Sequence, residues 1–474
     1  MSPRRDGPVL RYRVPAKAAY PSADRPWVPE TYGIGAVDDG DRHGRAVDLL
    51  WVWLAANIGI IGIVYGAVVA ALGLDLVQAL LVALAGSAGS FVFVGVLGVA
   101  GVRGGQPMLA LSRRVFGRRG NFGPALVSWV SLLGWEAITA VVALDALVAL
   151  LPGSVRGEPR QVIALGMLGV VVGLSVLAGR LGHATIVVVQ RLTAWVFGLA
   201  TLALAGYLVT RVHWASTLLA HPASPGAVMA AVSVVAASAG VSWVNVSADY
   251  SRYLPRSERA AGVVGWTTLG ASVPLAALVV VGFVLSSTVK GLASSSDPIQ
   301  ALLVLVPGWA GVPYVIVAVV GLLAQMIMGL YSSGLSLLAL GVRVRRTRTV
   351  LVDAGVVLVI GGWMVVAPSM FLGSFVSFVE LLACPISAWA AVFLVDMALR
   401  SRDRAGVGSM AVAVASWFAG SAAGLAFTSS PLFSGPLAVG VFAHSSLGYF
   451  VGATVAAVLF ASHLLDRRRT SPVY

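Results

Sequence analysis

The chain has 474 residues, of which 58% are hydrophobic and 11% are charged, and its mean hydropathy is +0.91. Soluble domains carry about 25% charged residues, so this composition excludes an ordinary water-soluble enzyme and predicts a polytopic membrane protein. The net charge of +13 lies in short segments between apolar runs, where it favours anchoring against anionic lipid over nucleic-acid binding.

The sequence contains twelve apolar segments, and most of them are longer than the about 20 helical residues that cross a bilayer. With both chain ends in the cytoplasm, 28 of the 32 lysine and arginine residues fall on the cytoplasmic side. This bias is the positive-inside signature, so we expect a multi-pass protein of the plasma or inner membrane with cytoplasmic N- and C-termini. The spans are expected at 48–72, 75–99, 124–151, 161–179, 185–210, 226–248, 261–287, 311–341, 350–367, 370–398, 407–427 and 437–464.

The spans divide into two sets of five and a final pair. Because five is an odd number, the second set would be inverted relative to the first. The expected fold is therefore an all-α, LeuT-like bundle of twelve transmembrane helices, with two inverted five-helix repeats and two peripheral helices. Its parts would be a mobile cytoplasmic tail without a signal peptide (1–46), the two repeats (47–225 and 226–400), helices 11 and 12 (401–465), and a cytoplasmic C-terminal tail (466–474).

The first and sixth spans contain residues that weaken a helix at membrane depth. Asn57 is followed by Gly59 in the first span, and the sixth has a run of serine, glycine and asparagine from Ser238 to Ser247. Irregular backbone is tolerated inside a membrane only where it lines a cavity. Since these spans hold equivalent places in the two repeats, the sequence predicts two discontinuous helices around a central binding site.

Polar and aromatic residues inside the spans mark the candidate site, because polar groups are costly in hydrocarbon. Simpler roles remain open: the tryptophans could be interfacial anchors, the serine a helix cap and the carboxyl a tie between helices. Asp249 and Arg252, near the cytoplasmic end of the sixth span, could form a structural ion pair or a gate. The candidate site residues are Asn57, Trp135, Glu136, Thr139, Ser242, Trp243, Gln325 and Gly329.

Four segments resemble the purine-cytosine permease branch of the nucleobase:cation symporter family, in matching order over about residues 45–465. They are GQPMLALSRRVFGRRG (105–120), LLGWEAITAVVALDAL (132–147), SADYSRYLP (247–255) and LYSSGLSLLALG (330–341). The resemblance implies a carrier that imports a nucleobase, cytosine or a purine, together with H⁺ or Na⁺ by alternating access, without enzymatic activity or a cofactor. The alternatives are a sodium-coupled carrier of allantoin, hydantoin, uracil or a vitamin and, more remotely, a receptor or channel.

The resemblance also implies how the ring is held. A planar ring would lie between an aromatic residue of the third helix, matched by Trp135, and one of the sixth, matched by Trp243. Thr139 stands at the polar position one turn after Trp135, and polar groups of helices 1, 3, 6 and 8 would bind the edge of the ring. Gly329 occupies a position where some relatives have asparagine, so it brings no side-chain hydrogen bond.

The coupling ion is judged from two features. Sodium-coupled relatives place hydroxyl oxygens on the eighth helix where this chain has Leu323 and Ala324, and sodium needs several oxygen ligands. Glu136 is a carboxyl beside the expected slot, where burial favours its protonated form. We therefore favour proton coupling, with Glu136 and Asn57 as candidate coupling groups and sodium as the alternative. The histidines and the single cysteine show no metal-ligand spacing.

Overall fold

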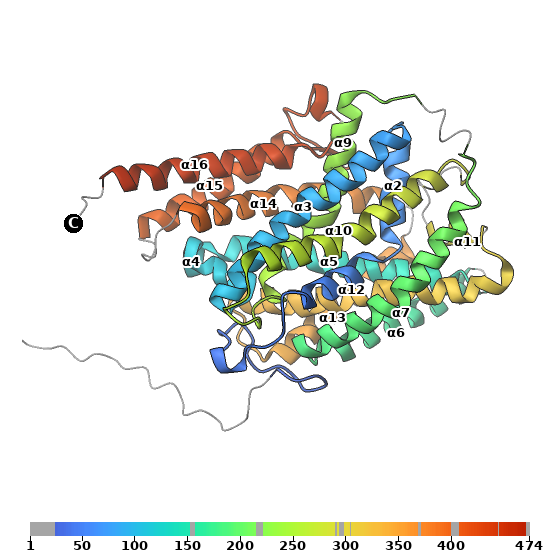
Figure 1. Ribbon diagram of the computed structural model, residues 1–474, viewed down its shortest axis with the longest axis horizontal. Coiled ribbons are helices and arrows are strands. Elements are labelled where there is room, and N and C mark those ends of the chain that lie inside the picture. Colours follow the sequence, from blue (N-terminus) through green and yellow to red (C-terminus); the bar gives the residue numbers. More distant parts are fainter. Residues whose placement is uncertain are drawn as a thin grey trace, which may run out of the picture.

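The computed structural model describes residues 24–151, 157–214, 221–289, 292, 298–303, 305–367, 371–399, 407–443 and 445–470. Within these residues, eleven helices are long and apolar enough to cross a membrane, and a bent pair supplies a twelfth span. The number of spans therefore matches the prediction. Figure 1 shows most of the spans running side by side along the long axis of the molecule, whereas α2 and α9 run more steeply across it.

The predicted first repeat corresponds to the spans from α1 to α7, and the predicted second to those from α9 to α14. The helices of the first are α1 (Asp48–Asn57), α2 (Ile61–Ala71), α3 (Leu76–Gly104), α4 (Met108–Gly120), α5 (Phe122–Val148), α6 (Glu158–Gly179) and α7 (His183–Val209). Those of the second are α9 (Pro225–Ala236), η2 (Ala237–Val241), η3 (Val244–Asp249), α10 (Ala260–Leu285), α11 (Pro298–Leu303), η5 (Gly308–Ala310), α12 (Gly311–Leu340), α13 (Arg346–Val366) and α14 (Phe371–Leu399).

Both predicted helix breaks are present. The axes of α1 and α2 meet at 60° across residues 58–60. In the sixth span, α9 passes into one π-helical turn, η2, where Ala239 leaves helical geometry at φ −93° and ψ −113°, and then into the 3₁₀ helix η3. The Ser90 hydroxyl accepts a hydrogen bond from the freed N–H of Gly240 at 3.0 Å, so a side chain replaces the helical partner that the break removes.

Glycines let the broken helices approach their neighbours at backbone distance. A Cβ atom on Gly66 of α2 would lie 2.0 Å from the Val279 carbonyl oxygen of α10, and one on Gly282 of α10 would lie 1.9 Å from that of Ile63. No larger residue fits at either position without separating the two helices. This packing of small residues joins α2, the second half of the first span, to α10.

Helices α5, α12 and α13 pack together on one side of the broken spans. Helix α12 packs along α5, and α13 packs against α5, α6 and α12. The peripheral helices α15 (Val407–Ala426) and α16 (Gly448–Thr470) pack on α14 and on each other, as Figure 1 also shows.

The last span begins later than predicted. We expected it from residue 437, but α16 begins at Gly448, after the hairpin of β1 (Ser429–Ser430) and β2 (Phe433–Ser434) and the short helix η7 (Gly440–Phe442). Gly440 has φ +61°, a conformation that a right-handed α-helix does not contain. The segment is apolar, so hydropathy alone could not separate this turn from the helix. We call this end of the bundle the hairpin end.

The prediction of a mobile tail at 1–46 is wrong for residues 24–46. Together with Val47, which precedes α1, they form what we call the N-terminal arm. The arm lies against the end of the bundle opposite the hairpin. The Val37 N–H donates to the Gly105 carbonyl oxygen at 2.9 Å, and the His43 N–H donates to that of Tyr253 at 2.7 Å. Residues 1–23 lie outside the described residues. Helix α16 finishes at the same end of the bundle as the arm (Figure 1), which we call the arm end.

Candidate functional site

A small pocket lies where the break in the sixth span faces α5 and α12, and we call it the central pocket. It contains seven of the eight predicted site residues. Its lining is Leu132, Trp135, Glu136 and Thr139 of α5, Ser242 and Trp243 of the sixth span, and Gln325, Met326 and Gly329 of α12.

Asn57 is the predicted residue that lies outside this lining. Its side-chain amide donates to the Trp53 carbonyl oxygen at 2.8 Å and so binds the last turn of α1 before the break. Helix α1 reaches the pocket wall through Trp53, whose ring meets that of Trp243 edge-on at a centroid distance of 5.5 Å. Sequence reasoning missed Trp53, although its position one turn before Asn57 in a broken span was an available signal.

Glu136 is the chemically distinctive residue of the pocket. Its side chain is buried, and neither carboxyl oxygen has a partner at hydrogen-bonding geometry within the described residues. A Cβ atom on Gly329 would lie 3.0 Å from Glu136 Cγ and 3.2 Å from its Oε1. Glycine at this position therefore makes room for the carboxyl. A buried polar group without a partner is costly and marks a site where a proton or a ligand can be bound.

The central pocket is closed in this conformation. Its cavity volume is about 20 Å³, which is space for one water molecule or so. Trp135 and Trp243 are 8% and 7% exposed. The two indoles and the carboxyl converge as predicted, but a cavity of this size admits no aromatic ring until its walls move apart.

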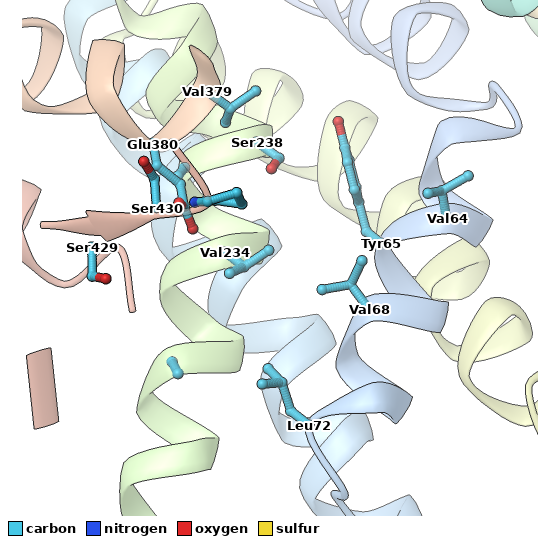
Figure 2. Close-up of a pocket in the computed structure, with 13 residues that line it drawn as sticks. Val64, Tyr65, Val68, Leu72, Val234, Ser238, Val379, Glu380, Ser429 and Ser430 are labelled. Carbon is cyan, nitrogen blue, oxygen red and sulfur yellow. The ribbon is translucent and has the colours of Figure 1, made fainter. Parts of the chain in front are cut away.

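A larger cavity, which we call the vestibule, opens toward the hairpin end and has a volume of about 340 Å³. Figure 2 shows Tyr65 of α2, Ser238 of η2 and Glu380 of α14 around it. Oε2 of Glu380 is buried without a hydrogen-bond partner in the described part of the chain. The Ser242 hydroxyl, which lines the central pocket, donates to the Ser238 carbonyl oxygen at 3.1 Å. The two cavities are therefore one turn of the broken helix apart.

The arm end is closed by a buried ionic cluster. Glu30 of the arm forms an ion pair with Arg252, and Arg346 Nε lies 4.0 Å from Glu30 Oε2. Arg252 also donates to the Tyr331 hydroxyl at 3.0 Å and to the Gly33 carbonyl oxygen at 2.6 Å. Burial by itself would raise the pKa of Glu30, but the guanidinium groups of Arg252 and Arg346 outweigh it and hold the pKa below its ordinary value.

A second cluster holds the start of the arm. Asp24 accepts from His183 Nδ1 at 2.6 Å and from the Ala184 N–H at 3.0 Å, and His43 Nε2 lies 3.3 Å from it. The His183 ring stacks on Tyr253 at 4.5 Å. Burial acts to raise the pKa of Asp24, but the two histidines and the backbone donor hold it well below its ordinary value. The arm is therefore attached by charged groups at two points.

The structure also shows the partners of Asp249 and Arg252, whose pairing the sequence left open. Arg252 pairs with Glu30. The Asp249 carboxylate accepts from the Met108 N–H at 2.8 Å and so caps the first turn of α4. Glu30 escaped sequence reasoning because it belongs to a polar segment that carries no sign of burial. In the described residues, no group of three histidine, cysteine, aspartate or glutamate side chains is arranged to bind a metal ion.

The structure has two broken helices beside a closed central pocket, a cavity at one end of the bundle and an ionic cluster at the other. This arrangement defines a secondary transporter of the LeuT-like fold. A family model described as "Permease for cytosine/purines, uracil, thiamine, allantoin" matches residues 36–452. The chain belongs to this family. It is thus a multi-pass membrane permease of a family that carries nucleobases and related heterocycles, and not an enzyme.

Known relatives agree with this assignment. The chain is 24% identical over 448 residues to YxlA of Bacillus subtilis (strain 168), whose name places it among purine-cytosine permeases; the match covers 90% of this chain and 93% of YxlA. Mhp1, a nucleobase-cation-symport-1 family transporter solved in a closed conformation with bromovinylhydantoin bound, has a similar fold, with a TM-score of 0.72 at 17% identity, covering 93% of this chain and 96% of Mhp1.

Two further solved structures share the fold as well. The inward-facing conformation of Mhp1 matches with a TM-score of 0.62 at 17% identity over 94% of each chain. A Na⁺-coupled sialic acid symporter in a substrate-bound outward-open state matches with a TM-score of 0.53 at 11% identity, covering 90% of this chain and 96% of that symporter.

Proposed function

We propose that the protein imports a nucleobase, cytosine or a purine, in symport with a proton, with the arm end facing the cytoplasm. The observation that carries the proposal is the buried carboxyl of Glu136, which lacks a hydrogen-bonding partner in the described residues and shares the wall of the central pocket with Trp135 and Trp243. The orientation rests on the 28 of 32 basic residues that this topology places in the cytoplasm.

The lining of the pocket suits a flat heterocycle. Indole rings stack on any planar base. A protonated carboxyl offers one donor and one acceptor side by side, which complements the adjacent ring nitrogen and amino group of cytosine or adenine. Thr139, Ser242 and Gln325 add further polar groups around the same pocket. The carboxyl would bind substrate best when it carries the transported proton, which couples the two bindings.

The oxygen groups that sodium needs are scarce on α12 beside the pocket. Leu323 and Ala324 present hydrocarbon side chains, and the carbonyl oxygen of Ala324 accepts a hydrogen bond from Gln190 Nε2 at 2.7 Å. A site for Na⁺ wants several free oxygens. This stretch of α12 therefore favours the proton as the coupling ion. Asn57, bonded to the end of α1, remains a candidate that would act through the break and not through substrate contact.

Alternating access follows from the two ends of the bundle. The vestibule leads from the hairpin end toward the central pocket, while the Glu30 cluster closes the arm end. Substrate would enter from outside through the vestibule, and release to the cytoplasm would require the arm-end cluster to separate. The better overlap with the closed than with the inward-facing conformation of Mhp1 supports this interpretation.

The test is uptake of radiolabelled cytosine by proteoliposomes under a pH gradient, with adenine, hypoxanthine, uracil, allantoin and thiamine as unlabelled competitors. We expect accumulation that a protonophore abolishes. Glu136→Gln should lose both the accumulation and the pH dependence, whereas the matched control Glu380→Gln, which changes a carboxyl of the vestibule, should keep its proton dependence. If Glu136→Gln retains the accumulation ratio and pH profile of the wild type, Glu136 is not the coupling group.

The second candidate is a sodium-coupled carrier of a related heterocycle such as allantoin or a hydantoin. It is favoured by the breadth of the family description and by the hydantoin bound to Mhp1. The same vesicles distinguish the two functions. A sodium gradient without a pH gradient would drive uptake by this second carrier and leave the proposed one inactive.

A further inference from the structure

One face of α13 carries a buried polar stripe. Arg346, Thr349 and Asp353 occupy positions i, i+3 and i+7, and they are 5%, 0% and 0% exposed. This spacing places them on one side of the helix. The stripe lies where α13 packs against α5, α6 and α12. The proposed transport function assigns no role to Thr349 or Asp353, and it involves Arg346 only through the Glu30 cluster.

Asp353 is the innermost member of the stripe. Its Oδ1 accepts a hydrogen bond from Trp129 Nε1 at 2.8 Å, and its Oδ2 accepts one from the Ser333 hydroxyl at 3.0 Å. None of the salt bridges in the described residues involves Asp353. A carboxyl at membrane depth without a cationic partner is costly, and such groups commonly belong to proton pathways.

Ser333 connects Asp353 with the central pocket. Gly329, which faces Glu136, precedes Ser333 by one turn of α12. A serine hydroxyl can accept one proton and donate another at the same time. Glu136, Ser333 and Asp353 therefore follow one another from α5 through α12 to α13.

This line runs from the pocket toward the arm end. Trp129, which binds Asp353, precedes Glu136 by seven residues on α5, or about 10 Å of helix. Beyond Asp353, the Thr349 hydroxyl donates to the Arg346 carbonyl oxygen at 2.7 Å. Arg346 then meets Glu30 of the arm and donates to the Arg180 carbonyl oxygen at 2.8 Å. The stripe thus joins the pocket to the cluster that closes the arm end.

We propose that this face of α13 is the exit route of the transported proton, with Asp353 as the first acceptor after Glu136. The O–H bond of the Glu136 acid breaks as its proton moves to Ser333 Oγ, and the hydroxyl proton of Ser333 moves to the Asp353 carboxylate. Glu136 is left as a carboxylate and Asp353 as an acid, so charge and atoms balance. The charged groups that face this route are Glu136 from α5, Arg346 on α13 and Glu30 from the arm. The inference rests on the proposed proton symport.

The experiment compares net uptake with counterflow in the same proteoliposomes. Net uptake of labelled cytosine under a pH gradient requires the proton to leave, whereas exchange of labelled for unlabelled cytosine at equal pH requires only binding and reorientation. Asp353→Asn should lower net uptake by at least about tenfold, because it removes a proton acceptor, and should leave counterflow close to that of the wild type. Asp353→Glu should recover much of the net uptake.

Controls separate this route from a structural role. Ser333→Ala should also lower net uptake more than counterflow, though less strongly than Asp353→Asn. It serves as the test variant if Asp353→Asn does not reach the membrane. Ser336→Ala changes a buried serine one turn away that bonds Ser128 at 3.1 Å, and both of its activities should match those of the wild type.

Two results would overturn the exit route. One is net uptake by Asp353→Asn equal to that of the wild type, and the other is an equal loss of net uptake and counterflow in a folded variant. Failure of the proposed symport would appear differently. Uptake by the wild-type protein itself would then ignore the protonophore.

Discussion

Glutamine in place of Glu30 tests whether the buried cluster holds the arm end closed. The side chains of Glu30 and Arg252 are 1% and 0% exposed. Removing one partner of such a pair costs about 3–5 kcal/mol, because the remaining charge is left buried without compensation. Glutamine still offers one oxygen to Arg252, so the lower limit of about 3 kcal/mol applies.

This cost falls on the conformation in which the arm end is closed. The bonds of Glu30 and Arg252 join the arm to the loop after η3 and to Tyr331 of α12. These contacts have to separate before the arm end opens. A loss of about 3 kcal/mol from the closed state corresponds to a shift of about 100-fold in the equilibrium between closed and open forms.

The assay measures how fast a buried cysteine reacts from the arm side. Ser128 is 1% exposed and bonds Asn245 at 2.8 Å, where α5 meets η3. Ser128→Cys would be built in a Cys384→Ser background, since Cys384 is the only cysteine of the chain. In inside-out vesicles, Glu30→Gln should raise the rate of modification by a membrane-impermeant thiol reagent by at least about tenfold, allowing for partial compensation.

The matched control is Arg256→Gln. It breaks an ion pair with Asp39 that also joins the arm to the loop after η3, but the two side chains are 60% and 67% exposed. Exposed pairs contribute about 0–1 kcal/mol, so the rate should change by less than about fivefold. An unchanged rate in correctly folded Glu30→Gln would refute the idea that this cluster closes the arm end.

Three further outcomes are expected. Gly329→Ala should weaken cytosine binding by about tenfold or more, because its Cβ would lie 3.0 Å from Glu136 Cγ and overpacking costs about 1–3 kcal/mol; unaltered affinity would contradict the contact. Trp243→Ala should lose about 1–3 kcal/mol of base stacking, and Trp243→Phe should retain most of it in the same binding assay. The hydrogen bond with Asp24 raises the pKa of His43 against the effect of burial, and nearby aspartates raise this pKa further. The contribution of His43 to docking the arm is therefore complete below pH 6.5 and is lost as the pH rises through the raised pKa. Hydrogen exchange of the arm amides should therefore show less protection at about pH 9 than at about pH 6, and His43→Gln should remove that difference; the low pKa of Asp24 matters only in strong acid.

Much of the central pocket was predictable because its signals are local. Trp135, Glu136 and Thr139 lie within one turn of a single helix, and a carboxyl in an apolar span has few roles other than function. The helix breaks were predictable for the same reason, since Asn57 and Gly59 weaken the helix in which they lie. The length of the apolar segments and the distribution of basic residues between them then determined the number of spans.

Partners distant in sequence could not be predicted in this way. Glu30 and Arg252 are 222 residues apart, and Asp353 and Trp129 are 224 apart. Each is an ordinary charged or aromatic residue in its own segment. Asp353 belongs to a span that composition describes simply as apolar, and Glu30 to a segment that composition describes as a solvated tail.

By itself, then, the sequence determined that this chain crosses the membrane about twelve times. It also determined where two of the helices break and which residues gather at the breaks, because hydropathy and helix propensity act over a few turns of chain. The tertiary structure decided that Trp53 packs behind the pocket residue Trp243 and that the arm closes one end. It also decided that Asp353 bonds Ser333, one turn of α12 from the glycine that faces Glu136. These features depend on which helix faces pack together, and the distance between two side chains on different helices exists only after that packing has formed.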